Sequence, residues 1–193
     1  MGLSVAVYCG SRFGDLPAYT NSARDLGRLI AQSGGSVIYG GGRVGLMGVV
    51  ADAALAAGGP VIGVIPQALM DREVGHLGLT ELHVVQTMHE RKQLMAERAD
   101  AFVALPGGIG TLEEIYEVWS WQQLGYHDKP VALLNVAGYY DDLLAFMRVS
   151  HERGFVSAPQ YHALLVDDDP ARLLDRLVQA AGQATARDDF SKI

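Results

Sequence analysis

Two hydrophobic patterns alternate along this chain. Short runs of consecutive apolar residues are typical of strands buried on both faces, and stretches with an apolar residue every three or four positions are typical of helices. The runs predict strands over 3–9, 36–39, 60–65, 81–85, 101–105, 131–135 and 164–166. The spaced stretches predict helices over about 19–33, 45–57, 88–98, 112–124 and 140–153, and a last helix with Asp169 as N-cap and Pro170 in its first turn.

Strands that alternate with helices predict right-handed βαβ crossovers. We therefore expect an α/β protein with a single doubly wound, Rossmann-like domain and a mostly parallel sheet. The nucleotide-binding domain should span residues 1–182, followed by a polar, frayed tail over 183–193. The stretch 66–80 has mixed polarity and weak periodicity, which predicts a long loop able to cover a site.

Composition narrows the class of protein. A chain of 193 residues is long enough for one domain with a sizeable core. The net charge of −7, without basic runs, argues against binding to nucleic acid or to a membrane. Cys9 is the only cysteine and no secretory leader is recognisable, so we expect a cytoplasmic protein. No His, Cys and carboxylate residues occur at metal-ligand spacing, and we expect neither a metal ion nor an organic cofactor.

A glycine-rich turn follows the strand over 101–105. Pro106-Gly107-Gly108-Ile109-Gly110-Thr111 leads directly into a helical pattern. Such turns commonly hold a phosphate, because glycines admit the anion and the N–H groups at the helix start point at it. Glu114 would lie in the first helical turn, where a carboxylate suggests chemistry on a phosphate ester. A structural alternative stays open, since Thr111-x-x-Glu114 also matches a capping box.

A second glycine-rich turn, Gly40-x-Gly42-x-x-Gly45, formally matches the dinucleotide-binding fingerprint. The next strand ends in Val64-Ile65-Pro66-Gln67, however, and lacks the acidic residue that would hold the ribose hydroxyls. A Walker loop is excluded because no Gly-Lys-Ser/Thr occurs. The turn is better explained as a second anion- or sugar-binding loop for the same ligand.

Arg91 and Lys92 follow another capping box, Thr87-x-x-Glu90, and so belong to the opening turn of the helix over 88–98. Cations there oppose the helix dipole, at about 0.3–1 kcal/mol each for an exposed site. A bound phosphate or leaving group would offset this cost. The alternative is a pair of solvated surface charges.

The run PGGIGTLEE over 106–114, with MHERK before it and WQQLGYHDKP after it, resembles the Lonely-guy (LOG) family of cytokinin riboside 5′-monophosphate phosphoribohydrolases. The resemblance extends from about Val5 to Tyr140. It implies an enzyme that hydrolyses a nucleoside 5′-monophosphate, preferably N6-prenylated AMP, to free base and ribose 5-phosphate. Arg91 and Glu114 would be the catalytic pair. The residues expected to contact the substrate are Gly10, Ser11, Gly41, Gly42, Gly45, Met88, Lys92, Pro106, Gly107, Gly108, Gly110 and Thr111.

Cleavage of an N-glycosidic bond passes through an oxocarbenium-like sugar. A carboxylate at Glu114 would stabilise this cation or orient the attacking water, and Arg91 would hold the phosphate or stabilise the departing base. The group that protonates the base stays open; His89 is a candidate for which a structural role is the safer interpretation. A nucleotide carrier without turnover is the rival interpretation.

Lysine decarboxylation is a further alternative, which we reject. It would require a lysine that forms a Schiff base with pyridoxal phosphate. Lys92, Lys129 and Lys192 are the only lysines, and none is well placed for this role.

Three details affect partners and specificity. The resemblance implies a homodimer, and the apolar aromatic helix over 115–124 is the expected contact. Arg12 follows Cys-Gly-Ser where many family members carry serine, which leaves the preferred substrate open. Met88 and Met95 could reach an isoprenoid tail, although core packing explains them as well.

Overall fold

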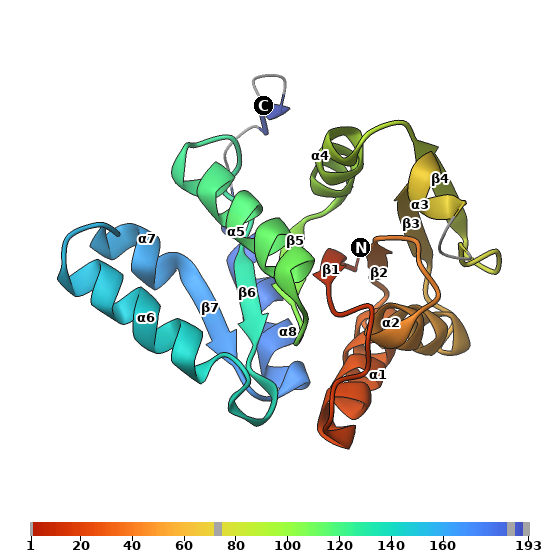
Figure 1. The fold of residues 1–193 in the computed structure, drawn as a ribbon, viewed down its shortest axis with the longest axis horizontal. Helices are drawn as coiled ribbons and strands as arrows, with labels where there is room; N and C mark the ends of the chain where they lie inside the picture. Colours follow the sequence, from red (N-terminus) through yellow and green to blue (C-terminus); the bar gives the residue numbers. More distant parts are fainter. Residues whose placement is uncertain (1, 72–74, 185–187, 191–193) are drawn as a thin grey trace.

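The computed structural model describes residues 2–71, 75–184 and 188–190. Seven strands form one sheet in the order β4-β3-β2-β1-β5-β6-β7, and every neighbouring pair is parallel (Figure 1). This confirms the doubly wound α/β fold, with a sheet more regular than the mostly parallel one expected. The strands are β1 (Ser4–Tyr8), β2 (Ser36–Tyr39), β3 (Val61–Pro66), β4 (Glu81–Val85), β5 (Ala101–Ala104), β6 (Val131–Leu134) and β7 (Leu164–Asp167).

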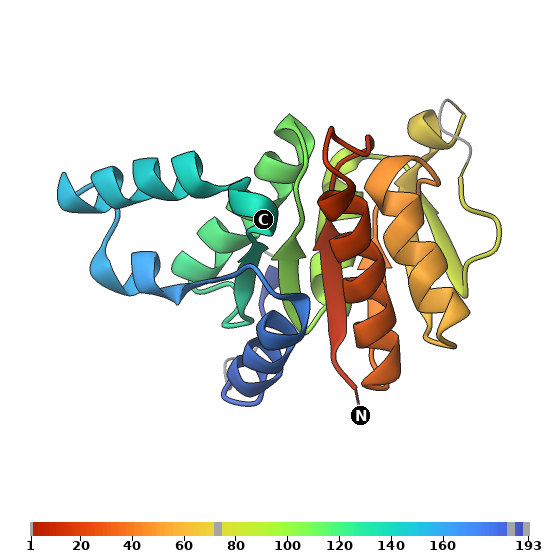
Figure 2. The same cartoon turned by 90° about the horizontal axis from the view of Figure 1, so that it is seen from below.

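Helices cover both faces of the sheet. α1, α2 and α8 lie along one face (Figure 2), and α4 and α5 contribute to the core on the other. The longer helices match the predicted ones within a few residues at each end. The helices are α1 (Pro17–Gln32), α2 (Gly45–Ala56), α3 (Gln67–Met70), α4 (Met88–Arg98), α5 (Ile109–Gln123), the 3₁₀ helix η1 (Val136–Gly138), α6 (Asp141–Glu152), α7 (Ala158–Ala163) and α8 (Pro170–Ala181).

The central strand β1 divides its side chains between the two layers of the core. Val5 and Val7 belong to the layer under α1 and α2, whereas Ala6 and Tyr8 belong to the layer under α4 and α5. Successive side chains of a strand point to opposite faces, which explains this division. Tyr8, the last residue of β1, therefore lies on the α4–α5 side at the carboxyl end of the sheet.

Two expectations about irregular segments need correction. The stretch 66–80 is not a continuous loop, because α3 begins directly after β3; residues 72–74 lie outside the described part of the chain. The described part of the tail is not frayed either. The Phe190 ring is buried 6.0 Å from the ring of Trp121, and Asp188 forms an ion pair with Lys129 at 2.6 Å. Residues 188–190 are thus held by the packing of Phe190 on Trp121 of α5 and by the ion pair of Asp188.

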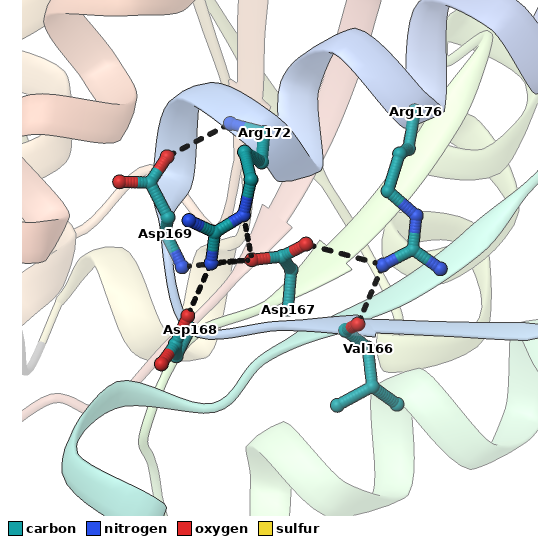
Figure 3. Close-up of polar contacts among 6 residues, drawn as sticks. All are labelled: Val166, Asp167, Asp168, Asp169, Arg172 and Arg176. Carbon is teal, nitrogen blue, oxygen red and sulfur yellow. Dashed lines mark hydrogen bonds and ion pairs between the residues drawn. The ribbon is translucent and has the colours of Figure 1, made fainter.

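A cluster of three aspartates joins β7 to α8 (Figure 3). Asp167 accepts hydrogen bonds from the amide of Asp169 at 3.0 Å and from the guanidinium groups of Arg172 and Arg176 at 2.8 and 3.2 Å. Asp169 caps α8, as predicted, by accepting from the amide of Arg172. Burial would raise the pKa of Asp167, but these donors hold it below its usual value. The cluster is satisfied by its own contacts and serves the fold.

Replacing Asp167 with alanine should lower the free energy of unfolding by about 1–3 kcal/mol, because the Asp169 amide and two arginine side chains lose hydrogen bonds to its carboxylate. Asp168→Ala is the matched control, since Asp168 is exposed and pairs only with Arg172. The pKa of Asp167 is depressed in the folded chain, so its contribution is present at neutral pH and disappears as the pH falls through that value. Thermal melts of both variants at pH 7 check this; equal melting temperatures would contradict it.

Candidate active site

Three loops that contain glycine, over 10–12, 40–45 and 106–111, follow β1, β2 and β5 and meet at the carboxyl ends of these parallel strands. The Gly10 amide donates to the carbonyl of Pro106 at 3.1 Å, and the Leu46 amide donates to the carbonyl of Gly10 at 3.0 Å. Gly45 has a φ of +57°, and a Cβ there would lie 2.3 Å from the carbonyl carbon of Ser11. Only glycine allows this approach. The loops thus form one surface at the edge of the sheet.

The first turn of α5 offers free N–H groups. α5 begins at Ile109, with Gly108 as N-cap and no side chain as capping acceptor. Among the described residues, the amides of Ile109, Gly110 and Thr111 have no acceptor. Three free donors at the positive end of a helix are the kind of arrangement that commonly binds an anion.

The capping-box interpretation of Thr111 and Glu114 is wrong. Thr111 is the third residue of α5 and is buried, and Glu114 is the sixth, which places it in the second turn. Glu114 therefore caps no backbone group. At Thr87 the capping prediction is confirmed in part: its hydroxyl accepts from the Glu90 amide, while the Glu90 carboxylate accepts from the amide of Gln86 rather than Thr87.

Arg91 and Glu114 face each other between α4 and α5, and each is only 9% exposed. Arg91 Nη2 lies 3.4 Å from Glu114 Oε1, longer than the 2.7–2.9 Å of a strong charged hydrogen bond. Arg91 Nη1 has only the sulfur of Met88, at 3.7 Å. Arg91 Nε has no acceptor among the described residues. A guanidinium carries five N–H donors, and a buried one with so few partners is arranged to receive a ligand.

Gly40 provides the space for this guanidinium. A Cβ at Gly40 would lie 2.0 Å from Arg91 Nη2. The second glycine loop therefore acts as a wall of the Arg91 site. Gly41 and Gly42, the next residues of this loop, are also buried. Gly42 forms an isolated antiparallel bridge with Gly75.

Burial affects the ionisation of Glu114. It raises the pKa of Glu114, and the neighbouring Arg91 only partly opposes this effect. Tyr8 shares the site: burial first, and then the charge of Glu114, raise the pKa of its phenol. Tyr8 is not among the site residues predicted from the sequence, because it lies in a run of mostly apolar residues that predicts only a buried strand. Its position as the last residue of β1 was the available signal.

Lys92 does not join Arg91 and Glu114. Its ammonium binds Glu113 at 2.5 Å and Glu117 at 2.9 Å, and so joins α4 to α5. Burial would lower the pKa of Lys92, but the two carboxylates raise it above its usual value. A lysine kept charged in this way is a poor Schiff-base former. Lys129 is likewise engaged, with the carbonyl of Ala96 and with Asp188, and Lys192 lies outside the described residues.

A cavity of about 550 Å³ opens at the start of α5, and residues 106–109 form part of its wall. Neither Arg91 nor Glu114 lines it. Arg12 lies in its wall and has no hydrogen-bond or ion-pair partner among the described residues. The lining residues are Gly10, Ser11, Arg12, Phe13, Gly14, Tyr19, Leu46, Pro106, Gly107, Gly108, Ile109 and Tyr139.

The remaining predicted positions divide between site and core. Met88 is exposed beside Arg91, where it can touch a ligand. Met95 is fully buried in the core, and His89 is exposed at the surface. In the part of the chain that the structure describes, no helix has the length and apolarity needed to cross a membrane. Within the same residues, no group of His, Cys, Asp and Glu could hold a metal ion.

Three relatives in sequence share one activity in their names, whereas the family model carries a different description. The family model described as "Possible lysine decarboxylase" matches residues 47–177. A probable cytokinin riboside 5′-monophosphate phosphoribohydrolase of Oryza sativa subsp. japonica is 46% identical, covering 92% of this chain and 77% of the relative. Cytokinin riboside 5′-monophosphate phosphoribohydrolases of Arabidopsis thaliana and Rhodococcoides fascians are 45% and 49% identical, covering 90% and 86% of this chain and 81% and 84% of the relatives.

Similar solved structures establish the fold. A molybdenum cofactor binding protein from Rippkaea orientalis gives a TM-score of 0.70 at 23% identity, covering 93% of this chain and 97% of its own. The Moco carrier protein of Chlamydomonas reinhardtii gives 0.71 at 21% identity, covering 94% and 99%. At such identities the likeness extends to the fold alone. The identities near 46% over most of both chains go further, and they show that this chain belongs to the Lonely-guy family of cytokinin riboside 5′-monophosphate phosphoribohydrolases.

Proposed function

We propose that this protein hydrolyses the N-glycosidic bond of a nucleoside 5′-monophosphate, preferably N6-prenylated AMP, to free base and ribose 5-phosphate. The observation that carries the proposal is the buried Arg91–Glu114 pair, in which the guanidinium keeps unfilled donors and faces a carboxylate at 3.4 Å. The relatives are named for this reaction, and Arg91 and Glu114 lie in the runs MHERK and PGGIGTLEE that resemble the family.

The proposed chemistry follows from the charges. As the bond between C1′ and the base breaks, its electron pair moves to the base and positive charge develops on the ribose. The Glu114 carboxylate stabilises that charge, or orients the water whose oxygen forms the new bond to C1′. The water gives up one proton as this bond forms and the departing base takes up one proton, so the products are the neutral base and ribose 5-phosphate. The free donors of Arg91 bind the phosphate or the departing base. The first turn of α5 holds the phosphate, which keeps the sugar beside Glu114.

The 5′-phosphate should be essential for turnover. The free amides of Ile109, Gly110 and Thr111 have no role toward a nucleoside without phosphate. We expect isopentenyladenosine to be hydrolysed at least about 100-fold less efficiently than its 5′-monophosphate, the effect of losing two charged hydrogen bonds. Values of kcat/KM measured for the two compounds check this. Comparable values would show that the phosphate does not bind at α5.

A panel assay separates the enzyme from the rival carrier. Prenylated and plain nucleoside 5′-monophosphates are each supplied in large excess, and released base is measured. An enzyme releases many equivalents of base per chain, whereas a carrier binds one equivalent and releases none. The same panel identifies the preferred base. It also shows whether this chain, with Arg12 in the cavity wall, prefers a nucleotide other than prenylated AMP.

We also propose a cytoplasmic homodimer, but the expected contact has to be revised. Trp119 and Trp121 are buried within their own chain, so the aromatic helix is not an exposed apolar patch. Exposed apolar side chains remain at its two ends, at Ile109 and Leu124. We expect light scattering at micromolar concentration to show a dimer, and a monomer alone would contradict this. The location rests on the single cysteine of the sequence.

A further inference from the structure

We infer that His76 is a positioning residue, which together with Asp52 fastens the chain at 75–78 to the second glycine loop and thereby holds Arg91 in place. The inference rests on the proposed function for its catalytic consequence, but the fastening itself can be measured without turnover. His76, only 5% exposed, is a buried polar side chain that the proposed mechanism does not use.

Both ring nitrogens of His76 are engaged. Nδ1 accepts a hydrogen bond from the amide of Gly78 at 3.2 Å. A nitrogen that accepts carries no proton, so the proton of the neutral ring is on Nε2. Nε2 lies 2.9 Å from Asp52 Oδ1 and donates to it. The ring therefore connects the chain at 76–78 to α2, and its tautomer is determined by these two partners.

The backbone around His76 is joined to the second glycine loop. The His76 amide donates to the carbonyl of Gly41 at 3.0 Å, and Gly75 and Gly42 form an antiparallel bridge. The bridge is isolated, so it has no neighbouring ladder bonds to support it. The His76 side chain supplies that support by anchoring the same segment to Asp52.

The glycine loop transmits this anchoring to Arg91. Gly40 immediately precedes Gly41 and Gly42, the two loop residues joined to the chain at 75–76, and its position leaves just enough room for the Arg91 guanidinium. A shift of the loop toward α4 would push the guanidinium, and a shift away would free it to turn. Neither His76 nor Asp52 lines the cavity at the start of α5. Asp52 lies on α2, on the opposite face of the sheet from α4. Their influence on Arg91 is thus indirect.

Asp52 is the position to test, because its side chain is 60% exposed and can be removed without opening the core. Asp52→Ala removes the acceptor for Nε2–H, whereas Asp52→Asn keeps an oxygen in the same place. The matched control is Asp25→Ala, an exposed helical aspartate whose partner is Arg28. His76→Gln removes the acceptor at Nδ1 and serves as the second variant.

Backbone hydrogen exchange tests the fastening independently of any reaction. We expect peptides covering 40–43 and 75–78 to exchange at least about tenfold faster in Asp52→Ala and His76→Gln than in the natural chain. Asp52→Asn and Asp25→Ala should exchange like the natural chain. Unchanged exchange in both Asp52→Ala and His76→Gln overturns the inference, whether or not the protein turns over a nucleotide.

Turnover tests the consequence for Arg91. Asp52→Ala should lower kcat about tenfold, Asp52→Asn should restore it, and Asp52→Ala should cost nothing more when Arg91 is already replaced by lysine. A merely structural loss would instead add to that of Arg91→Lys, and that result overturns the positioning role. If the natural chain releases no base from any nucleotide, the proposed function fails, while the exchange result still decides the fastening.

Discussion

Replacing Glu114 with glutamine should lower turnover of the nucleotide by roughly 10²–10⁴-fold, the usual loss when a charge-stabilising or proton-accepting group is removed. Glutamine has the same shape but no negative charge toward the developing sugar cation. The melting temperature should change by only a few degrees. The amide oxygen can still accept from Arg91, and replacing a carboxylate whose pKa burial raises relieves its desolvation at neutral pH.

Glu113→Gln is the matched control for Glu114→Gln. Glu113 precedes Glu114 in the chain, but its half-exposed carboxylate pairs with Lys92 and does not face Arg91. We expect Glu113→Gln to keep turnover within a few-fold of the natural protein. Steady-state base release and thermal melts of the two variants give the comparison. Equal turnover in both would show that the Glu114 carboxylate has no part in the chemistry.

The pH dependence gives the same residue a second signature. Burial raises the pKa of Glu114, so the ionised carboxylate is lost while the pH is still above the usual range for glutamate. If the charged form is the active one, kcat/KM should fall as the pH decreases through this raised value. Glu114→Gln should lack that acid limb, because glutamine does not titrate.

The second large loss of turnover should come from a substitution that displaces the Arg91 side chain without removing it. Gly40→Ala places a Cβ 2.0 Å from Arg91 Nη2, and the guanidinium, as the far end of a flexible side chain, has to give way. A displacement of about 1 Å in a catalytic group can lower turnover about 100-fold. We expect a loss of this size with little change in melting temperature. Gly182→Ala, where a Cβ has no atom closer than 3.4 Å, is the control.

Arg91→Ala should abolish turnover too, but its effect on stability differs from what the sequence indicates. An exposed cation at a helix start could be removed without cost, whereas Arg91 is buried against Glu114. Breaking a buried pair typically costs about 3–5 kcal/mol, and here less because the contact is long. Gly40→Ala is therefore the cleaner variant. Full activity in Gly40→Ala would show that the position of the guanidinium does not matter.

The fold could be predicted from the sequence because strands such as β1 and β5 are continuous apolar runs in a fully covered parallel sheet. The glycine-containing loops meet because the carboxyl ends of parallel strands lie at one edge of the sheet. The short helices α3 and α7 were not predictable in the same way. With four and six residues, they show too little of the helical period to be recognised.

The catalytic and substrate-binding roles of the site residues stay predictions, and the geometry of these residues could not be predicted from the sequence. The start of α5 was misplaced because Gly108 as N-cap leaves no side-chain signal, while Thr111 offers a misleading one. Arg91 and Lys92 are neighbours in the chain, but their side chains contact different carboxylates. Arg91 faces Glu114, whereas Lys92 pairs with Glu113 and Glu117. The packing of α4 on α5 determines this difference. Local sequence contains no signal for that packing.

The most direct measurement follows both products of one reaction. Isopentenyladenosine 5′-monophosphate is incubated with the protein, and free base and ribose 5-phosphate are quantified over time. We predict that the two appear in equal amounts, over many turnovers, and that Glu114→Gln suppresses both together. Release of inorganic phosphate instead of base, or binding of one nucleotide per chain with neither product formed, would contradict hydrolysis of the N-glycosidic bond.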